Sequence, residues 1–155
     1  MFWLSDNEHN RQAQTCGLSW ERYTEGSGDA EVERIPAAVW RQRGRAHYVS
    51  YEEPVSDKTG DVRTTLKIEA DALTWIRHGL VTWTHTFRAG EEHTSRMLVG
   101  GQAMEITTST KRLEIDVTGH GGRVFMEYDM IMGGDPQRIR LTLRFEQGEC
   151  HEAHE

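Results

Sequence analysis

The chain has 155 residues, with 18 Lys and Arg against 25 Asp and Glu, which gives a formal net charge of −7 at pH 7. This length suits a single compact domain, since domains most often contain roughly 100 to 150 residues. The acidic charge opposes a phosphate backbone, so nucleic acid is not an expected partner. The first residues lack the features of a secretory signal, and no segment approaches the roughly 20 apolar residues that cross a bilayer. We therefore expect a cytoplasmic protein that does not bind membranes.

Short segments of alternating apolar and polar residues follow one another along the chain, separated by breaks that contain glycine. This pattern is typical of antiparallel strands joined by tight turns. About eight to ten strands can be placed, enough to close a barrel whose interior is filled by side chains or holds one small ligand. The predicted fold is therefore an all-β, closed, up-and-down antiparallel barrel. Residues 16–148 would form this single domain, between a frayed N-terminal segment, 1–15, and an acidic C-terminal tail, 149–155.

Two cysteines mark the ends of the predicted domain. Cys16 lies in the first apolar segment, and Cys150 follows the last one. The two ends of a closed antiparallel barrel can be neighbours, so a disulfide between them is geometrically conceivable. Cytoplasmic thiols are usually kept reduced, and the free-thiol interpretation is therefore preferred.

The first hairpin that can be placed pairs Trp40 with His47. Because side chains alternate between the two faces of a strand, His47 and Tyr51 then share one side. Pairing of Val49 with Leu66 on the next strand turns that side toward the barrel interior. Two polar aromatic side chains are thus predicted to point inward.

The stretch over residues 62–87 contains two further turns. A tight turn at residues 70–71 sets the pairs Ile68–Leu73, Leu66–Trp75 and Thr64–Arg77. A three-residue turn over 78–80, with Gly79 supplying a positive φ, sets the pairs Arg77–Val81, Trp75–Trp83 and Leu73–His85. This register sends Arg77 and His85 inward and the threonines outward. A two-residue turn would instead put Trp83 and Phe87 outside.

The C-terminal third contains a bulge and two hairpins. The alternation breaks between Ile106 and Leu113, which predicts a bulge or bend there. Turns at residues 120–121 and 134–135 set the pairs Val117–Val124, Ile115–Met126, Leu113–Tyr128, Met130–Ile139, Tyr128–Leu141, Met126–Leu143 and Val124–Phe145. The outer face would then carry a charge ladder of Arg112, Asp129 and Arg140. It would also carry two facing carboxylates, Glu114 and Glu127, which are more typical of plain surface than of an acid–base pair.

Four segments carry a resemblance to a known family: YVSYEE (48–53), TTLKIEADALTWIRHG (64–79), MEITTSTKRLEIDV (104–117) and GGRVFMEYDM (121–130). In this order they resemble the YwiB-like family of small bacterial calycin-type β-barrels, which are grouped with lipocalin-like folds. The resemblance implies a lipocalin-like barrel with no established activity, so it brings no catalytic residue with it. Lipocalin relatives often pack an Arg of the last strand on a Trp of the first, which suggests Trp20 and Arg144 as such a pair.

Motifs that carry chemistry are missing from the sequence. No phosphate-binding loop, zinc-protease motif, hydrolase elbow or pair of CxxC motifs occurs, so we predict no catalytic residues, no cofactor and no metal site. The glycine clusters at 99–101, 119–122 and 132–134 are interpreted as hairpin turns. The tail CHEAHE (150–155) contains metal-ligating residue types, but a chain end lacks the rigid backbone of a specific site. We interpret it as a disordered acidic tail, with adventitious metal binding as the alternative.

The best functional candidates are the polar side chains on the predicted inward face: Arg77, His85, His47 and Tyr51. A buried Arg needs a carboxylate, water or a ligand anion, because an unpaired buried charge is costly. In an open lumen, Arg77 would hold an anionic head group while Trp75, Trp83 and Leu66 surround an apolar body. In a filled lumen, Arg77 would pair internally, for which Glu53 is the candidate.

Three functional hypotheses follow. The first is a binding module for a small amphipathic or anionic molecule in the barrel lumen. The alternative is an interaction protein with a filled core, monomeric or homodimeric, that acts through an outer surface where Ile76 and Phe125 are apolar among polar residues. An enzyme that uses His85 and His47 as acid and base is the least supported, because no nucleophile is placed beside them.

Overall fold

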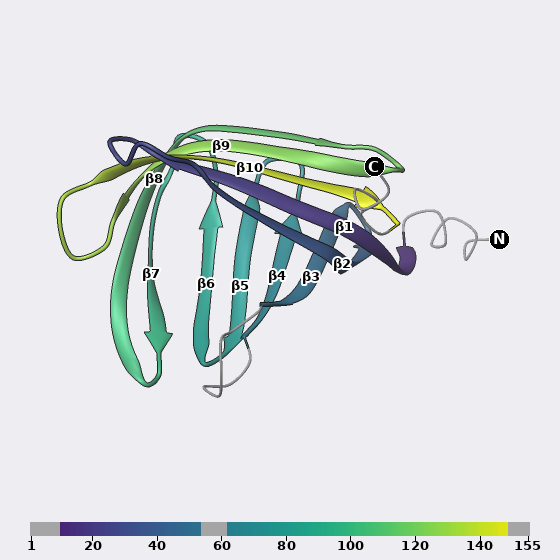
Figure 1. The fold of residues 1–155 in the computed structure, drawn as a ribbon, viewed down its shortest axis with the longest axis horizontal. Helices are drawn as coiled ribbons and strands as arrows, with labels where there is room; N and C mark the ends of the chain where they lie inside the picture. The colour runs from purple at the N-terminus through teal and green to yellow at the C-terminus, as the bar shows by residue number, and fades with distance from the viewer. Residues whose placement is uncertain (1–9, 54–61, 149–155) are drawn as a thin grey trace.

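The computed structural model describes residues 10–53 and 62–148. They form ten antiparallel strands that close into a barrel, shown in Figure 1. The strands are β1 (Asn10–Thr24), β2 (Glu31–Arg43), β3 (Ala46–Glu53), β4 (Val62–Ile68), β5 (Leu73–Gly79), β6 (Val81–Phe87), β7 (Glu92–Val99), β8 (Gln102–Val117), β9 (Gly121–Ile131) and β10 (Gln137–Gln147). Among these residues there is no helix, and hence none long and apolar enough to span a bilayer. The predicted all-β barrel is confirmed.

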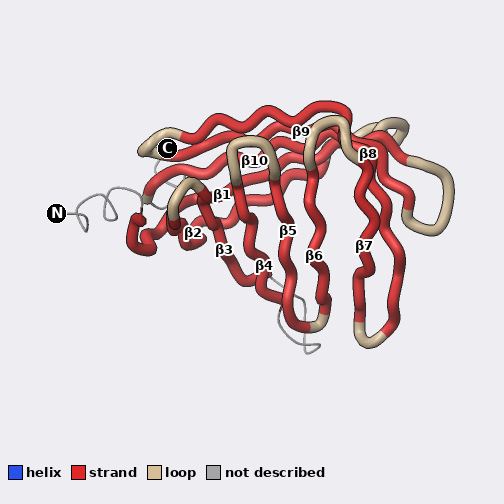
Figure 2. The backbone as a smooth tube through the Cα atoms, turned by 180° about the vertical axis from the view of Figure 1, so that it is seen from behind, coloured by secondary structure: helices blue, strands red, loops and turns tan. Residues whose placement is uncertain are grey.

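Each strand pairs with its neighbours in sequence, and β1 closes the cylinder by pairing with both β2 and β10. The strand β1 begins at Asn10, six positions before the predicted start of the domain, because the long strand β2 still offers it partners there. Figure 2 shows from behind how β3 to β7 descend from the longer strands. The longest strand, β8, pairs first with β7 and then with β9. The predicted bulge is confirmed between Thr110 and Arg112, within the pairing of β8 with β9 and just after the pairing with β7 ends at Ser109.

The faces are correct on each strand for which they were predicted, but the register is correct for only some turns. The pairs across β4 and β5, and Val49 with Leu66, are as predicted. At four other turns the register differs by two residues, and the observed pairs are Trp40–Val49, Trp75–His85, Ile115–Val124 and Tyr128–Ile139. A shift by an even number of residues leaves each side chain on its face.

The alternative two-residue turn between β5 and β6 is wrong. Trp83 and Phe87 are buried, whereas Thr82 and Thr84 are exposed. Gly79 has a φ of 120°, which a residue with a side chain rarely adopts.

Two predictions about the outer face are corrected by the same shift. Glu114 lies opposite Phe125 and not opposite Glu127, whose partner is Arg112. The ladder is rearranged too, because Asp129 pairs with Arg138 and forms an ion pair with it. No facing pair of carboxylates therefore exists on β8 and β9.

The suggested packing of Arg144 on Trp20 is also wrong. Arg144 is exposed, whereas Trp20 packs against the core, opposite Leu143. The guanidinium of Arg22 instead lies 5.8 Å from the centre of the Trp20 ring.

One end of the barrel interior is filled by side chains and is called the packed end: Trp40, Val49, Met126, Leu143 and Phe145, all at most 2 % exposed. The rings of Trp40 and Phe145 meet edge to face at 4.9 Å. Gly122 lies opposite Phe145, and a Cβ added to it would come within 2.7 Å of that ring. Here a glycine is required because the aromatic ring occupies the space of a side chain.

Candidate ligand cavity inside the barrel

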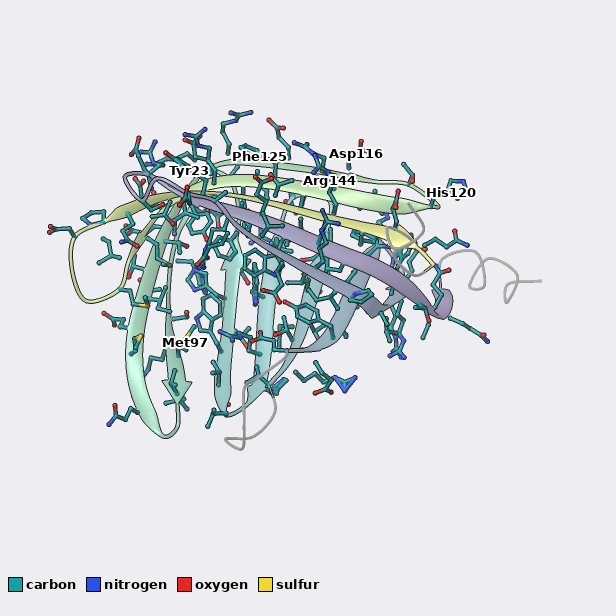
Figure 3. The ribbon with its side chains drawn as sticks, viewed as in Figure 1. Tyr23, Met97, Asp116, His120, Phe125 and Arg144 are labelled. Atoms are coloured by element: carbon teal, nitrogen blue, oxygen red, sulfur yellow. The ribbon has the colours of Figure 1, made fainter. Side chains whose placement is uncertain are left out.

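A cavity of about 470 Å³ occupies the opposite part of the interior. Most of its lining is aromatic, aliphatic or methionine, with four charged side chains among them. The lining residues are Trp20, Arg22, Glu33, Ile35, Tyr51, Glu53, Trp75, Arg77, Trp83, Phe87, Met97, Ile106, Tyr128, Met130 and Met132. We call this the lumen cavity, and the part of the barrel around it the cavity end. Figure 3 shows one lining residue, Met97, extending from β7.

An ion pair crosses one wall of the cavity. Arg77 donates from Nε to Oε2 of Glu53 over 3.0 Å and from Nη2 to Oε1 over 2.7 Å. Thr64 donates a further hydrogen bond to Oε2. Each partner is 22 % exposed at the side chain, so the pair is only partly shielded from water. The predicted internal partner of Arg77 is thus confirmed, while the lumen beside it is not filled.

Tyr51 lies between these charges and the core. It is 7 % exposed, and burial raises the pKa of its hydroxyl to about 12, with the charge of Glu53 acting in the same direction. The Arg77 charge and a hydrogen bond with Thr64 oppose this shift. Tyr51 therefore stays protonated at neutral pH and can offer the cavity a polar group without a charge.

A chain of side-chain hydrogen bonds supports the aromatic wall. Trp83 donates from Nε1 to Ser95 Oγ over 2.8 Å. Ser95 Oγ lies 2.6 Å from Nδ1 of His85, whose Nε2 lies 2.7 Å from Oγ1 of Thr108. Both ring nitrogens of His85 are thus engaged, and burial lowers its pKa to about 4. The neutral His85 ring positions Trp83 and presents no free nitrogen to a ligand.

The seven predicted lumen residues divide into two groups. Four of them line the cavity: Tyr51, Trp75, Arg77 and Trp83. Three do not: Leu66 and His85 are buried behind the wall, and His47 accepts a hydrogen bond from Trp40 Nε1 over 3.0 Å at the packed end. His47 and His85 are therefore not both at the cavity, as the acid–base hypothesis would require.

Sequence reasoning left a second group of lining residues out of the candidate site. They come from β1, β2, β7, β9 and the turn after β9, and include Trp20, Glu33, Met97, Met130 and Met132. Met130 was predicted to point inward, but the cavity that these residues share with Arg77 depends on closure of the barrel by the pairing of β1 with β10.

A second hollow, of about 780 Å³, lies at the turn between β9 and β10. It is lined by Ala103, Met104, Glu105, Thr107, Ile131, Met132, Gly133 and Gly134. Three of its apolar lining side chains, Met104, Ile131 and Met132, are each 40–46 % exposed. The predicted outer residue Phe125 differs from these, because the guanidinium of Arg112 lies 5.0 Å from its ring centre.

The two cysteine predictions and the tail stay open. Cys16 is buried, and burial raises the pKa of its thiol to about 11. Its neighbour Thr15 accepts a hydrogen bond from the backbone of Gly148, so the two ends of the described barrel do meet. Cys150 and the tail 150–155 lie outside the described residues.

Comparisons with known proteins agree with this architecture. Over 102 residues the chain is 28 % identical to the uncharacterized β-barrel protein YwiB of Bacillus subtilis (strain 168), covering 65 % of this chain and 70 % of the relative. The crystal structure of the ywiB protein from Bacillus subtilis superposes with a TM-score of 0.77 at 24 % identity, covering 91 % of this chain and 96 % of that one. Residues 21–151 match the family described as a domain of unknown function, DUF1934. The chain therefore belongs to the DUF1934 family of YwiB-type β-barrel proteins.

Proposed function

We propose that this protein binds a small amphipathic molecule with a mostly apolar body in the lumen cavity. The observation that carries the proposal is the cavity itself, about 470 Å³ in volume and lined mainly by apolar side chains. Ligand pockets typically measure roughly 300–1,000 Å³ and combine an apolar lining with a few polar groups that orient the ligand. The hydroxyl of Tyr51 and the ion pair of Arg77 and Glu53 would supply those polar groups.

The pairing of Arg77 favours an amphipathic ligand over an anionic one. Its guanidinium already donates two hydrogen bonds to Glu53. A ligand anion would have to displace that carboxylate and leave it in a partly buried place without its counter-charge, which is costly. Arg77 would therefore help to orient the ligand while it stays paired with Glu53, and it would not bind an anionic group of the ligand.

Fluorescence of diphenylhexatriene, an uncharged apolar probe that brightens when it leaves water, tests the proposal. The native protein should bind it saturably, with about one probe per chain. Met97→Trp, which places a bulky ring in the cavity, should weaken binding by about tenfold or more. Leu98→Trp is the matched control, because the neighbouring Leu98 is exposed and does not line the cavity. Absence of binding to the native protein, or equal affinity of the two variants, would overturn the proposal.

A second candidate function is self-association through the exposed apolar side chains at the second hollow, Met104, Ile131 and Met132. Contiguous exposed apolar patches on soluble proteins often mark interaction sites. A second copy of the chain would cover this face in a homodimer. Light scattering measures the mass in solution, and Ile131→Glu should convert a dimer to a monomer. A native protein that is monomeric at high concentration contradicts this candidate.

A further inference from the structure

The four charged side chains that line the lumen cavity differ in whether they have an ion-pair partner. Arg77 is neutralised by Glu53, and Arg22 forms an ion pair with Glu31. The fourth charged lining residue is Glu33, whose carboxylate forms no ion pair with any residue that the structure describes. Among the described residues, Glu33 is therefore the one charged lining residue without an ion-pair partner.

Glu33 lies on the inward face of β2. It is half-buried, lies opposite Trp20 of β1, and its charge reaches the hydroxyl of Tyr51 across the cavity. A carboxylate in this position loses part of its hydration without gaining a protein partner. It would gain most from a ligand that brings a positive charge.

The walls beside Glu33 consist of aromatic rings, which also attract cations. Indoles bind ammonium and guanidinium groups over their faces. Trp20, Trp75 and Trp83 all line the cavity, and Trp20 already has the guanidinium of Arg22 5.8 Å from its ring centre. The net charge of −7 adds a weak long-range attraction for cations.

We infer that the ligand of the lumen cavity is an amphipathic cation, an apolar body that bears an amine or a quaternary ammonium group, with Glu33 as its counter-charge. This inference rests on the proposed function, because it names the class of ligand for the same cavity. The apolar body would lie among the tryptophans and methionines, and the ammonium group would face Glu33. The ion pair of Arg77 and Glu53 stays intact in this arrangement.

Three probes that share one fluorophore test the charge preference. They are diphenylhexatriene, its trimethylammonium derivative and its propionic acid derivative, which are neutral, cationic and anionic. We expect the cationic probe to bind about fivefold or more tightly than the neutral one, and the anionic probe to bind most weakly. The preference should shrink as salt rises, because salt screens partly exposed charges.

Glu33→Gln should remove the preference for the cation, measured as the ratio of the affinities for the cationic and the neutral probe. Glu21→Gln, on the exposed face of the neighbouring strand β1, makes the same change of charge outside the cavity and should preserve the preference. Equal binding of all three probes would overturn the cation inference while the cavity proposal stands. Binding of none of them would overturn both, and a preference that survives Glu33→Gln would remove Glu33 from the site.

Discussion

The two ends of the barrel interior share the strands β2, β3 and β9, yet one is filled and the other is hollow. At the packed end, Trp40 is fully buried against Phe145, and Gly122 leaves room for that ring. At the cavity end, Trp20 and Trp75 are only partly buried around about 470 Å³ of space. The comparison shows that alternation defines an interior, whereas the fit of individual side chains decides whether the interior is filled.

The largest expected difference between the ends is in their sensitivity to truncation of a tryptophan. Trp40→Ala should lower the free energy of unfolding by about 3–5 kcal/mol, because it removes a fully buried ring and leaves a cavity in a closely packed region. Trp75→Ala should cost clearly less, since that ring already borders empty space. Urea denaturation of both variants measures the difference, and equal losses would show that the two ends are packed alike.

A smaller effect is expected from adding a methyl group at the packed end. Gly122→Ala would place a Cβ within 2.7 Å of the Phe145 ring, and the overpacking should cost up to about 3 kcal/mol. Gly134→Ala, in the turn near the cavity end, meets no atom within 4 Å and should change stability little. Thermal unfolding of the two variants compares the sites. A tolerant Gly122 would mean that Phe145 can move.

The pH dependence of stability should report on His85, which supports the wall of the cavity. Its pKa falls from 6.5 to about 4 because burial disfavours the charged ring. Between these pH values the unfolded chain binds a proton that the folded chain excludes. The free energy of unfolding therefore decreases by about 1.4 kcal/mol for each unit by which the pH is lowered. This contribution is complete above pH 6.5 and decreases below it.

From pH 7 to pH 5, His85 alone should therefore remove about 2 kcal/mol of stability. Urea unfolding at both pH values, for the native protein and for His85→Gln, isolates this share from that of the carboxylates. The variant should lose less stability than the native protein over the same range. An identical loss in both would mean that His85 can be protonated in the folded barrel.

The smallest expected effect concerns the ion pair at the cavity end. Glu53→Gln should cost about 1 kcal/mol, because it leaves the partly buried Arg77 without its counter-charge, while water at the cavity limits the loss. Glu52→Gln is the matched control, since Glu52 is exposed on the other face of β3 and its contact with Arg63 is 3.4 Å long. Urea denaturation gives the free energy of unfolding of the two variants, and Glu53→Gln should lose more of it. Equal losses would show that water screens the pair of Glu53 and Arg77 as fully as an exposed pair.

The faces of the strands were predictable from the sequence because burial of one face makes apolar and polar residues alternate along each strand. Tyr128 and Leu141 are buried as predicted, although each pairs with a different residue than expected. The register was harder to predict because it depends on turn length. The turn at residues 70–71 was placed correctly, whereas the loop at 131–136 can close in two ways that keep the same faces.

The candidate site was predictable in part for a related reason. Arg77, Tyr51 and their aromatic neighbours lie on adjacent strands, so local pairing alone brings them together. Glu33 and Met130 were not grouped with them, because Glu33 lies beyond the paired part of the β2–β3 hairpin and Met130 lies on β9, far along the chain. The size of the cavity was equally inaccessible, since it depends on how far opposite walls stand apart.

The chain of hydrogen bonds from Trp83 through Ser95 and His85 to Thr108 has a consequence for how the cylinder opens. Backbone pairing between β6 and β7 is confined to Val81 with Val99 and the adjacent pair, so the rest of this seam is held by side chains. Side-chain links break more readily than a continuous ladder, and local opening of a native protein begins where such links replace it. Amide hydrogens along this seam should exchange with solvent before those of β8 to β10, and a ligand too wide for the resting barrel could enter through it.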